Sequence, residues 1–319
     1  MNSYNIVNYK LRPQKQIERG LLAVLINDFA TVLGKDINYV GMGSLLFVDF
    51  TFFNKYCRLK RMISIEKMLD QEGNFDKNKE KRFINNKPLD KIELISQPVS
   101  DAIDEMPLDE NGFIWLDYDG QIETETIDDL ERIIEGIQVT CILAITFNGG
   151  ASKKYKSDNK INLEACERDF EPYRVEDSGE VIPLFNKDNY GMVSSMICEK
   201  YLLDKVGYYN DIYGKNLSME RISEVHYSDN AKMTTLVWAI INEEDECANE
   251  IRKKFETFEG AGEIRLSMEN LTLYEKMRID RCPLNKVEEL ATEMGLDMDT
   301  IHKYLKYAKY IPEYSEVYY

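Results

Sequence analysis

The sequence has few of the residues that build metal centres and disulfide frameworks. Its 319 residues include only two histidines and six cysteines, and the cysteines are scattered without a CxxC pair. Structural zinc sites and disulfide-rich secreted folds need such residues at close spacings, so the pattern argues against both classes. We expect free thiols in a reducing compartment.

The chain also lacks long hydrophobic runs and any excess of positive charge. No run reaches the roughly 18 apolar residues of a membrane span, and the first residues do not resemble a secretory signal. Forty basic residues against 57 acidic ones give a formal net charge of -17. This charge opposes indiscriminate binding to nucleic-acid backbones and anionic lipid. We therefore expect a cytoplasmic protein with no membrane partner, and nucleic acid is a disfavoured partner.

Apolar runs and helical patterns alternate through the first half of the chain. A helical pattern that opens at Pro13 and ends at Gly34 comes first. Five short apolar runs then predict strands, with helical patterns between most of them, at residues 38–42, 61–65, 91–96, 113–116 and 140–147. Such alternation predicts an α/β fold with a doubly wound, mostly parallel sheet that binds ligands at the carboxyl ends of its strands. Runs at 222–227 and 233–242, joined by a turn at 228–231, predict a terminal antiparallel pair.

The pattern divides the chain into three regions. Residues 1–34 form an N-terminal helical segment, residues 35–262 form the α/β domain, and residues 263–319 form a small helical tail. Within the domain, residues 151–190 are polar and poor in periodicity, which indicates an insertion or a lid. In the tail, Gly295 lies between two helical patterns and resembles the turn of a helix-turn-helix. The tail's tyrosines and acidic residues favour packing or a protein partner over DNA.

The most informative stretch runs from residue 37 to residue 66. A predicted strand ends in the turn Gly41-Met42-Gly43-Ser44, a helical pattern follows, and a second predicted strand ends at Glu66. In a βαβ unit such glycines let the backbone approach a ligand, and an acid after the second strand accepts hydrogen bonds from a ribose. We expect a nucleoside-containing cofactor here. Without a ligand, the glycines would form only a tight turn and Glu66 would be a solvated carboxylate facing Lys67 or Arg61.

Further polar residues follow the fourth and fifth predicted strands. Parallel strands bring their carboxyl ends to one edge, so Gly41, Glu66, Asp117 and Asn148 should gather there. Asp117, Asp119 and Asn148 could converge on Mg²⁺ or Ca²⁺, because hard cations prefer oxygen ligands. Alternatively, Asp119 and Gly120 form a simple turn and Asp117 accepts hydrogen bonds. A divalent cation therefore remains an open alternative.

Taken together, these features resemble a class I S-adenosylmethionine-dependent methyltransferase, over roughly residues 35–242. Finer matches resemble a bacterial O-methyltransferase family: Asn8-Tyr9, Arg12-Pro13, Lys15, Glu18-Arg19, Tyr39 to Ser44, Asp49-Phe50 and Trp115 to Gly120. The resemblance implies a Rossmann-like methyltransferase domain that uses S-adenosylmethionine. It implies that Gly41, Gly43, Ser44, Glu66 and Asp117 bind this cofactor, and that Asp117 lies near the reacting methyl group as the catalytic residue.

The sequence departs from the usual methyltransferase pattern at two positions. Many members carry an acid two residues before the first glycine and a third glycine two residues after the second, where this chain has Tyr39 and Leu45. No proline follows Asp117, which disfavours methylation of an adenine amino group. The resemblance therefore favours transfer to an oxygen of a small-molecule or macromolecular acceptor that the sequence does not identify.

Two other functions remain open. The altered glycine motif is also compatible with a noncatalytic ligand sensor or scaffold in a multicomponent bacterial system such as phage defence, with a protein bound through the tail. A nicotinamide-dependent oxidoreductase is disfavoured, because a GxGxxG motif would need glycine at Leu46. Arg12, Lys15 and Arg19 form either a solvated helix face or a clamp for a carboxylate or phosphate.

Overall fold

The computed structural model describes residues 12–70, 72–157, 160–175, 181–228, 231–268 and 271–311. Asn8, Tyr9, the centre of the predicted turn at 228–231 and the tyrosines after residue 311 lie outside these ranges. All six cysteines lie within them and are free. Among the described helices, none combines the length and the apolarity that crossing a bilayer requires.

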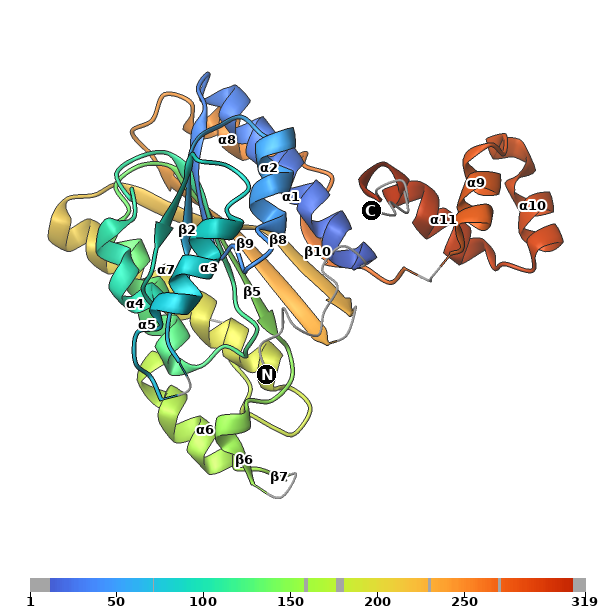
Figure 1. Ribbon diagram of the computed structural model, residues 1–319. Helices are drawn as coiled ribbons and strands as arrows, with labels where there is room; N and C mark the ends of the chain where they lie inside the picture. The colour runs from blue at the N-terminus through green and yellow to red at the C-terminus, as the bar shows by residue number, and fades with distance from the viewer. Residues whose placement is uncertain are drawn as a thin grey trace.

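A mixed sheet of eight strands forms the centre of the protein (Figure 1). Its order is β10-β8-β9-β5-β4-β1-β2-β3, in which β9 runs antiparallel to β5 and β8 and the other neighbours are parallel. The strands are β1 (Ile37–Gly41), β2 (Leu59–Ile65), β3 (Ile92–Ile95), β4 (Gly112–Asp117), β5 (Cys141–Asn148), β8 (Leu217–Ser228), β9 (Lys232–Asn242) and β10 (Gly262–Arg265). The predicted doubly wound fold with a terminal antiparallel pair is confirmed.

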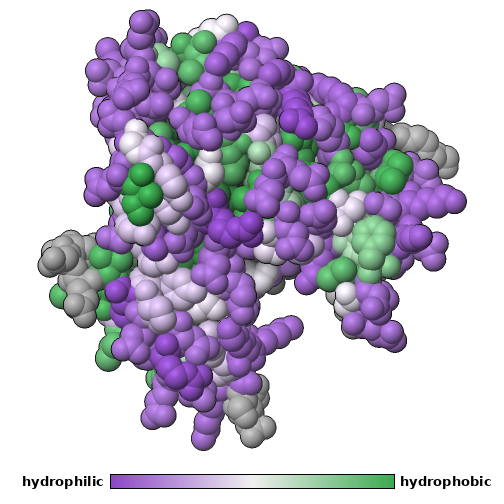
Figure 2. All heavy atoms as spheres, turned by 90° about the vertical axis from the view of Figure 1, so that its left-hand side faces the viewer, coloured by the Kyte–Doolittle hydropathy of each residue, from purple (hydrophilic) through white to green (hydrophobic). Residues whose placement is uncertain are grey.

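Helices cover both faces of the sheet, which is why its central strands are buried on both sides. One face packs against α4 (Val99–Ala102), α5 (Thr124–Gly136) and α7 (Tyr190–Tyr213). The other face packs against α1 (Pro13–Val32), α2 (Val48–Tyr56), Phe83 of α3 (Lys77–Asn86) and α8 (Ala248–Glu256). Figure 2 shows one face of the molecule, on which hydrophilic side chains predominate and hydrophobic ones form scattered patches, one of them in a central hollow. The sequence patterns missed α3, α8 and β10.

The insertion between β5 and α7 is more ordered than its polar sequence suggests. It holds a short hairpin, β6 (Lys156–Ser157) with β7 (Lys160–Ile161), and helix α6 (Leu163–Phe170). Phe170 and Phe185 lie 5.1 Å apart by ring centroids, and Phe185 lies 5.4 Å from Tyr190 of α7. These aromatic contacts anchor the insertion to the main core.

The tail forms a small lobe of its own beside the sheet (Figure 1). It consists of α9 (Leu273–Asp280), α10 (Val287–Met294), α11 (Met298–Tyr307) and a final turn, η7 (Ala308–Tyr310). Gly295 takes a left-handed conformation, with φ +68°, between α10 and α11. The side chain of Asp297 then caps α11 by accepting a 2.8 Å hydrogen bond from the Thr300 amide. The predicted glycine stop and the helix after it are confirmed.

One close contact fastens the tail to α1. A Cβ atom on Gly20 would lie 2.2 Å from the ring of Tyr310, so only glycine leaves room for this tyrosine. Lys309 forms a 2.8 Å ion pair with Glu259, and the hydroxyl of Tyr310 donates to the same carboxylate. The end of the tail is thus held against α1.

We expect the Gly20→Ala substitution to displace Tyr310 and to destabilise the protein by about 1–3 kcal/mol, because the added methyl group overpacks the contact. Thermal unfolding and limited proteolysis near residues 266–272 would measure both effects. Gly207→Ala in α7 is the matched control, since its Cβ meets no atom within 4 Å. This control should be neutral or stabilising by up to about 1 kcal/mol. Equal stability and protease resistance in the two variants would contradict the proposed role of the contact.

Candidate functional site

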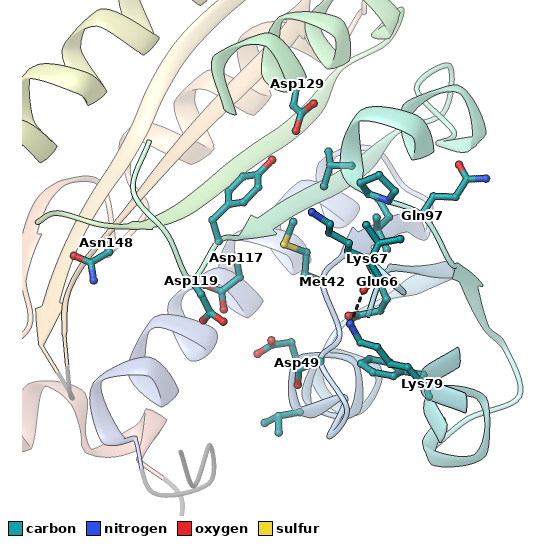
Figure 3. Close-up of a pocket in the computed structure, with 18 of the residues that line it drawn as sticks. Met42, Asp49, Glu66, Lys67, Lys79, Gln97, Asp117, Asp119, Asp129 and Asn148 are labelled. Atoms are coloured by element: carbon teal, nitrogen blue, oxygen red, sulfur yellow. Dashed lines mark hydrogen bonds between the residues drawn. The ribbon is translucent and has the colours of Figure 1, made fainter. Parts of the chain in front are cut away.

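A cavity of about 840 Å³ lies at the carboxyl ends of β1, β2, β4 and β5 (Figure 3). This is the edge where the sheet order reverses between β1 and β4, the usual ligand position in open α/β sheets. Of the four residues predicted to gather at this edge, Glu66, Asp117 and Asn148 line the cavity and Gly41 does not; Ser44 also lines it. No described residue of 151–190 lines it.

Gly41 and Gly43 are not among the residues that line the cavity, and close packing requires a glycine at both positions. A Cβ atom on Gly41 would lie 2.3 Å from the hydroxyl oxygen of Tyr39. A Cβ atom on Gly43 would lie 2.6 Å from Oγ of Ser64 and 2.7 Å from the ring of Phe47. The Gly43 amide donates a 3.2 Å hydrogen bond to the same Ser64 oxygen. The glycines therefore draw the loop tightly onto β2.

The departures from the usual glycine pattern are absorbed into the core. Tyr39 and Leu45, at 1% and 5% exposure, both pack into the core on the α1 face. Ser44 instead takes the left-handed conformation, with φ +49°. Such strain in a residue other than glycine persists only where surrounding structure imposes it, and it is commonest at functional sites.

Glu66 ends β2 and faces the glycine loop. The hydroxyl oxygen of Ser64 lies 3.5 Å from Oε1 of the Glu66 carboxyl group. Burial raises the pKa of Glu66 to about 7, although the backbone amides of Ser44 and Gly43 and the charge of Lys79 oppose the rise. Figure 3 shows Lys79 reaching toward Glu66, and its ammonium group donates a 2.6 Å bond to the carbonyl of Lys67. Arg61, a suggested partner of Glu66, pairs with Glu93 instead.

Residues after β3 complete this end of the cavity. The cavity is also lined by Gln97, Pro98, Val99 and Ser100. The sequence analysis named none of them as site residues. Their position directly after the third predicted strand could have indicated them, because it places them at the same sheet edge as Glu66.

The charged residues of α1 do not form a solvated face. Lys15 is 1% exposed and forms ion pairs with Asp117 at 3.0 Å and Glu18 at 2.8 Å. Its ammonium group also lies 4.3 Å from the ring centroid of Trp115. Arg19, equally buried, pairs with Asp49 of α2. For Lys15 and Arg19 the solvated-face interpretation is wrong, because each of them meets a carboxylate from another element.

A chain of hydrogen bonds extends this ionic cluster across the sheet. Thr235 of β9 donates to Glu18 and lies 2.6 Å from the hydroxyl of Thr146 on β5. The indole of Trp115 donates a 2.9 Å bond to Thr146. The cluster therefore connects α1 to β4, β5 and β9.

Asp117, Asp119 and Asn148 share the cavity but do not form a metal centre in this arrangement. One oxygen of Asp117 binds Lys15, and the amide oxygen of Asn148 accepts a 2.8 Å bond from Gly150. In Figure 3 Asn148 stands apart from the two carboxylates. Within the described ranges, no three His, Cys, Asp or Glu side chains are placed to hold a metal ion.

Several solved methyltransferase structures are similar to this chain. One of them is Trm1 from Pyrococcus horikoshii, solved with S-adenosyl-L-methionine, which is 14% identical and has a TM-score of 0.44. The match covers 77% of this chain and 58% of Trm1. An O-methyltransferase from Bacillus cereus, solved with SAH, is 10% identical with a TM-score of 0.33, covering 74% of this chain and 94% of its own. An rRNA methylase from Streptococcus thermophilus is 10% identical with a TM-score of 0.35, covering 72% of this chain and 98% of its own.

Curated proteins and family models give contrasting results. No curated protein matches the chain. A model of the family described as "Putative O-methyltransferase" matches residues 7–319, which include every element of the sheet, the cavity and the tail. The chain belongs to this methyltransferase family.

Proposed function

We propose that the cavity binds S-adenosylmethionine and that the protein transfers its methyl group to an oxygen atom of an acceptor. The observation that carries the proposal is Glu66, a partly desolvated carboxylate held beside the glycine loop at the end of β2. A carboxylate in this position suits the two hydroxyl groups of a ribose. Membership of the family supports the same activity.

The cavity residues fit the two ends of this cofactor. Glu66 would bind the ribose, and Gln97 to Ser100 would surround the base. Gly43 and Ser44 keep the loop backbone close to the cavity. A larger residue at position 43 would displace this backbone. These positions account for the adenosine half.

The methionine half needs charges of both signs, because it carries a carboxylate, an ammonium group and a sulfonium. The cavity offers Arg12 directly before α1, Arg19 on α1, and the carboxylates of Asp49 and Asp117. Arg12 and Arg19 would attract the cofactor's carboxylate. The hypothesis of a carboxylate clamp therefore still holds for these two residues. Asp49 and Asp117 would face its cationic groups.

When bound, the cofactor supplies an electrophilic methyl group. Asp117 lies at the cavity wall, where it would accept the proton of an acceptor hydroxyl group and so leave the oxygen free to attack. Burial raises the pKa of Asp117 against the opposing charge of Lys15, which makes the carboxylate a stronger base. The acceptor is a small molecule or a macromolecule, and a partner bound by the tail stays a prediction.

A noncatalytic ligand sensor is the second candidate, favoured by the strained Ser44 and the bulky Leu45 in the glycine loop. Its role in a multicomponent bacterial system, such as phage defence, rests on the resemblance alone. Transfer of a labelled methyl group to any component of a cell lysate would rule out this candidate.

We expect Gly43→Ala to weaken cofactor binding about ten-fold or more, a loss of at least about 1.4 kcal/mol. The added methyl group would collide with Ser64 and Phe47 and push the loop amides away from β2. Isothermal titration with S-adenosylhomocysteine would measure the loss. Gly207→Ala on α7 is the control and should bind as the wild type does. Unchanged affinity in a folded Gly43→Ala protein would contradict the assigned site.

The affinity for S-adenosylhomocysteine should depend on pH through Glu66. Because the pKa of this carboxyl group is raised to about 7, it is mostly protonated at pH 6 and mostly ionised at pH 8. Ribose hydroxyl groups donate to the ionised form, so binding should be about ten-fold weaker at pH 6 than at pH 8. The same titrations of the Glu66→Gln variant between pH 6 and pH 8 are the control, because they measure the pH dependence that comes from the ligand itself. A wild-type profile as flat as that of Glu66→Gln would refute the role of Glu66.

A further inference from the structure

Lys15 is a buried cation whose charge faces the cavity wall rather than the solvent. It lies within 3.0 Å of Asp117 and 2.8 Å of Glu18, and it stacks over the indole of Trp115. Replacing a buried ion pair by apolar side chains of similar volume is often neutral or stabilising. Stability alone therefore does not explain why α1 brings an ammonium group to this point.

We propose that Lys15 is a positioning residue of the active site, whose ammonium group keeps the carboxylate of Asp117 charged and oriented at the cavity wall. The inference rests on the proposed function, in which Asp117 takes the proton of the acceptor. A carboxyl group that is already protonated cannot do this. Lys15 would thus make Asp117 competent as a base without touching cofactor or acceptor itself.

Two opposing effects act on Asp117. Burial raises its pKa, while the charge of Lys15 and its hydrogen bond lower it. For Lys15, burial lowers the pKa, but the charges of Asp117 and Glu18 outweigh burial and raise it above its usual value. Lys15 therefore stays protonated at any physiological pH and is a permanent counter-charge.

Glu18 shares the ammonium group but has a different environment. It is fully buried, burial raises its pKa, and it accepts a hydrogen bond from Thr235. Asp117 is 23% exposed at its side chain and borders the cavity. Of the two carboxyl groups beside Lys15, only Asp117 can meet an acceptor.

The position of Lys15 is set from several directions. The ion pair of Arg19 with Asp49 and the packing of Tyr310 on Gly20 also hold α1, which carries Lys15. Other charged and titratable groups act on the cluster of Lys15, Glu18 and Asp117 from the residue before α1, from α1, α2 and β8: Arg12, Arg19, Asp49 and Tyr227. Any test must separate Lys15 from these neighbours.

Trp115 offers a direct optical readout of this cluster. The chain has two tryptophans, so a Trp238→Phe background leaves the Trp115 indole, 4.3 Å from the ammonium group, as the only one. We would follow Trp115 fluorescence against pH in this background, without any ligand. A titration that disappears in Asp117→Asn and persists in Glu18→Gln would report the ionisation of Asp117.

In Lys15→Met, the midpoint of this titration should move upward by about 1–3 pH units, the usual effect of an opposite charge at this distance. If the Met variant does not fold, Lys15→Gln is the second variant, because it keeps hydrogen-bond donors without the charge. It should shift the midpoint in the same direction. Circular dichroism would confirm the fold of each variant. If Lys15 were merely structural, its replacement would lower the melting temperature and leave the pH midpoint of Trp115 fluorescence unchanged. That result would overturn the proposal.

A separate titration with S-adenosylhomocysteine distinguishes this inference from the proposed function. Lack of binding by the wild-type protein would refute the cofactor site. The fluorescence midpoints would still decide whether Lys15 controls the charge of Asp117, because they are measured without cofactor or acceptor.

Discussion

The burial of the Lys15 ammonium group is the interaction on which the arrangement of this protein depends. A charge removed from water must be paired, and here the partners come from α1 itself and from the end of β4. This requirement sets the position of α1 along the sheet edge. Arg19 then meets Asp49 of α2, and Gly20 receives Tyr310 of the tail. One buried cation thereby relates the N-terminal helix, the cavity and the C-terminal lobe.

The opposite end of the cavity is organised by close approach rather than by charge. Gly41 leaves room for the side chain of Tyr39 and Gly43 for that of Ser64, and the backbone amides of Gly43 and Ser44 oppose the rise in the pKa of Glu66. The conformational cost appears at Ser44, which adopts a left-handed backbone without being glycine. Leu45, which stands where many methyltransferases have a third glycine, packs into the core beside this residue.

The sequence patterns predicted the central fold well because strand and helix periodicities are local. The run at 140–147 became β5, buried along nearly its whole length, and the run at 113–116 became the centre of β4. Elements with little apolar contact escaped detection. Helix α3 begins at the capping side chain of Asp76 and buries only Phe83, and its sequence is almost entirely polar apart from Phe83 and Ile84. The contacts that hold the insertion also escaped detection, since its aromatic residues are spaced irregularly and meet only in three dimensions.

By itself, the sequence determined the alternation of strands and helices, the glycine turn and the acid after β2, because each depends on neighbouring residues in the chain. From these it also determined that Glu66, Asp117 and Asn148 would share one edge. Only the tertiary structure decided what surrounds them. Lys15 and Arg19 have the spacing of an exposed helix face, yet they are buried because Asp117 and Asp49 arrive from distant parts of the chain. Periodicity records which side of a helix is charged, whereas the partner that permits a charge to leave water is a property of the fold.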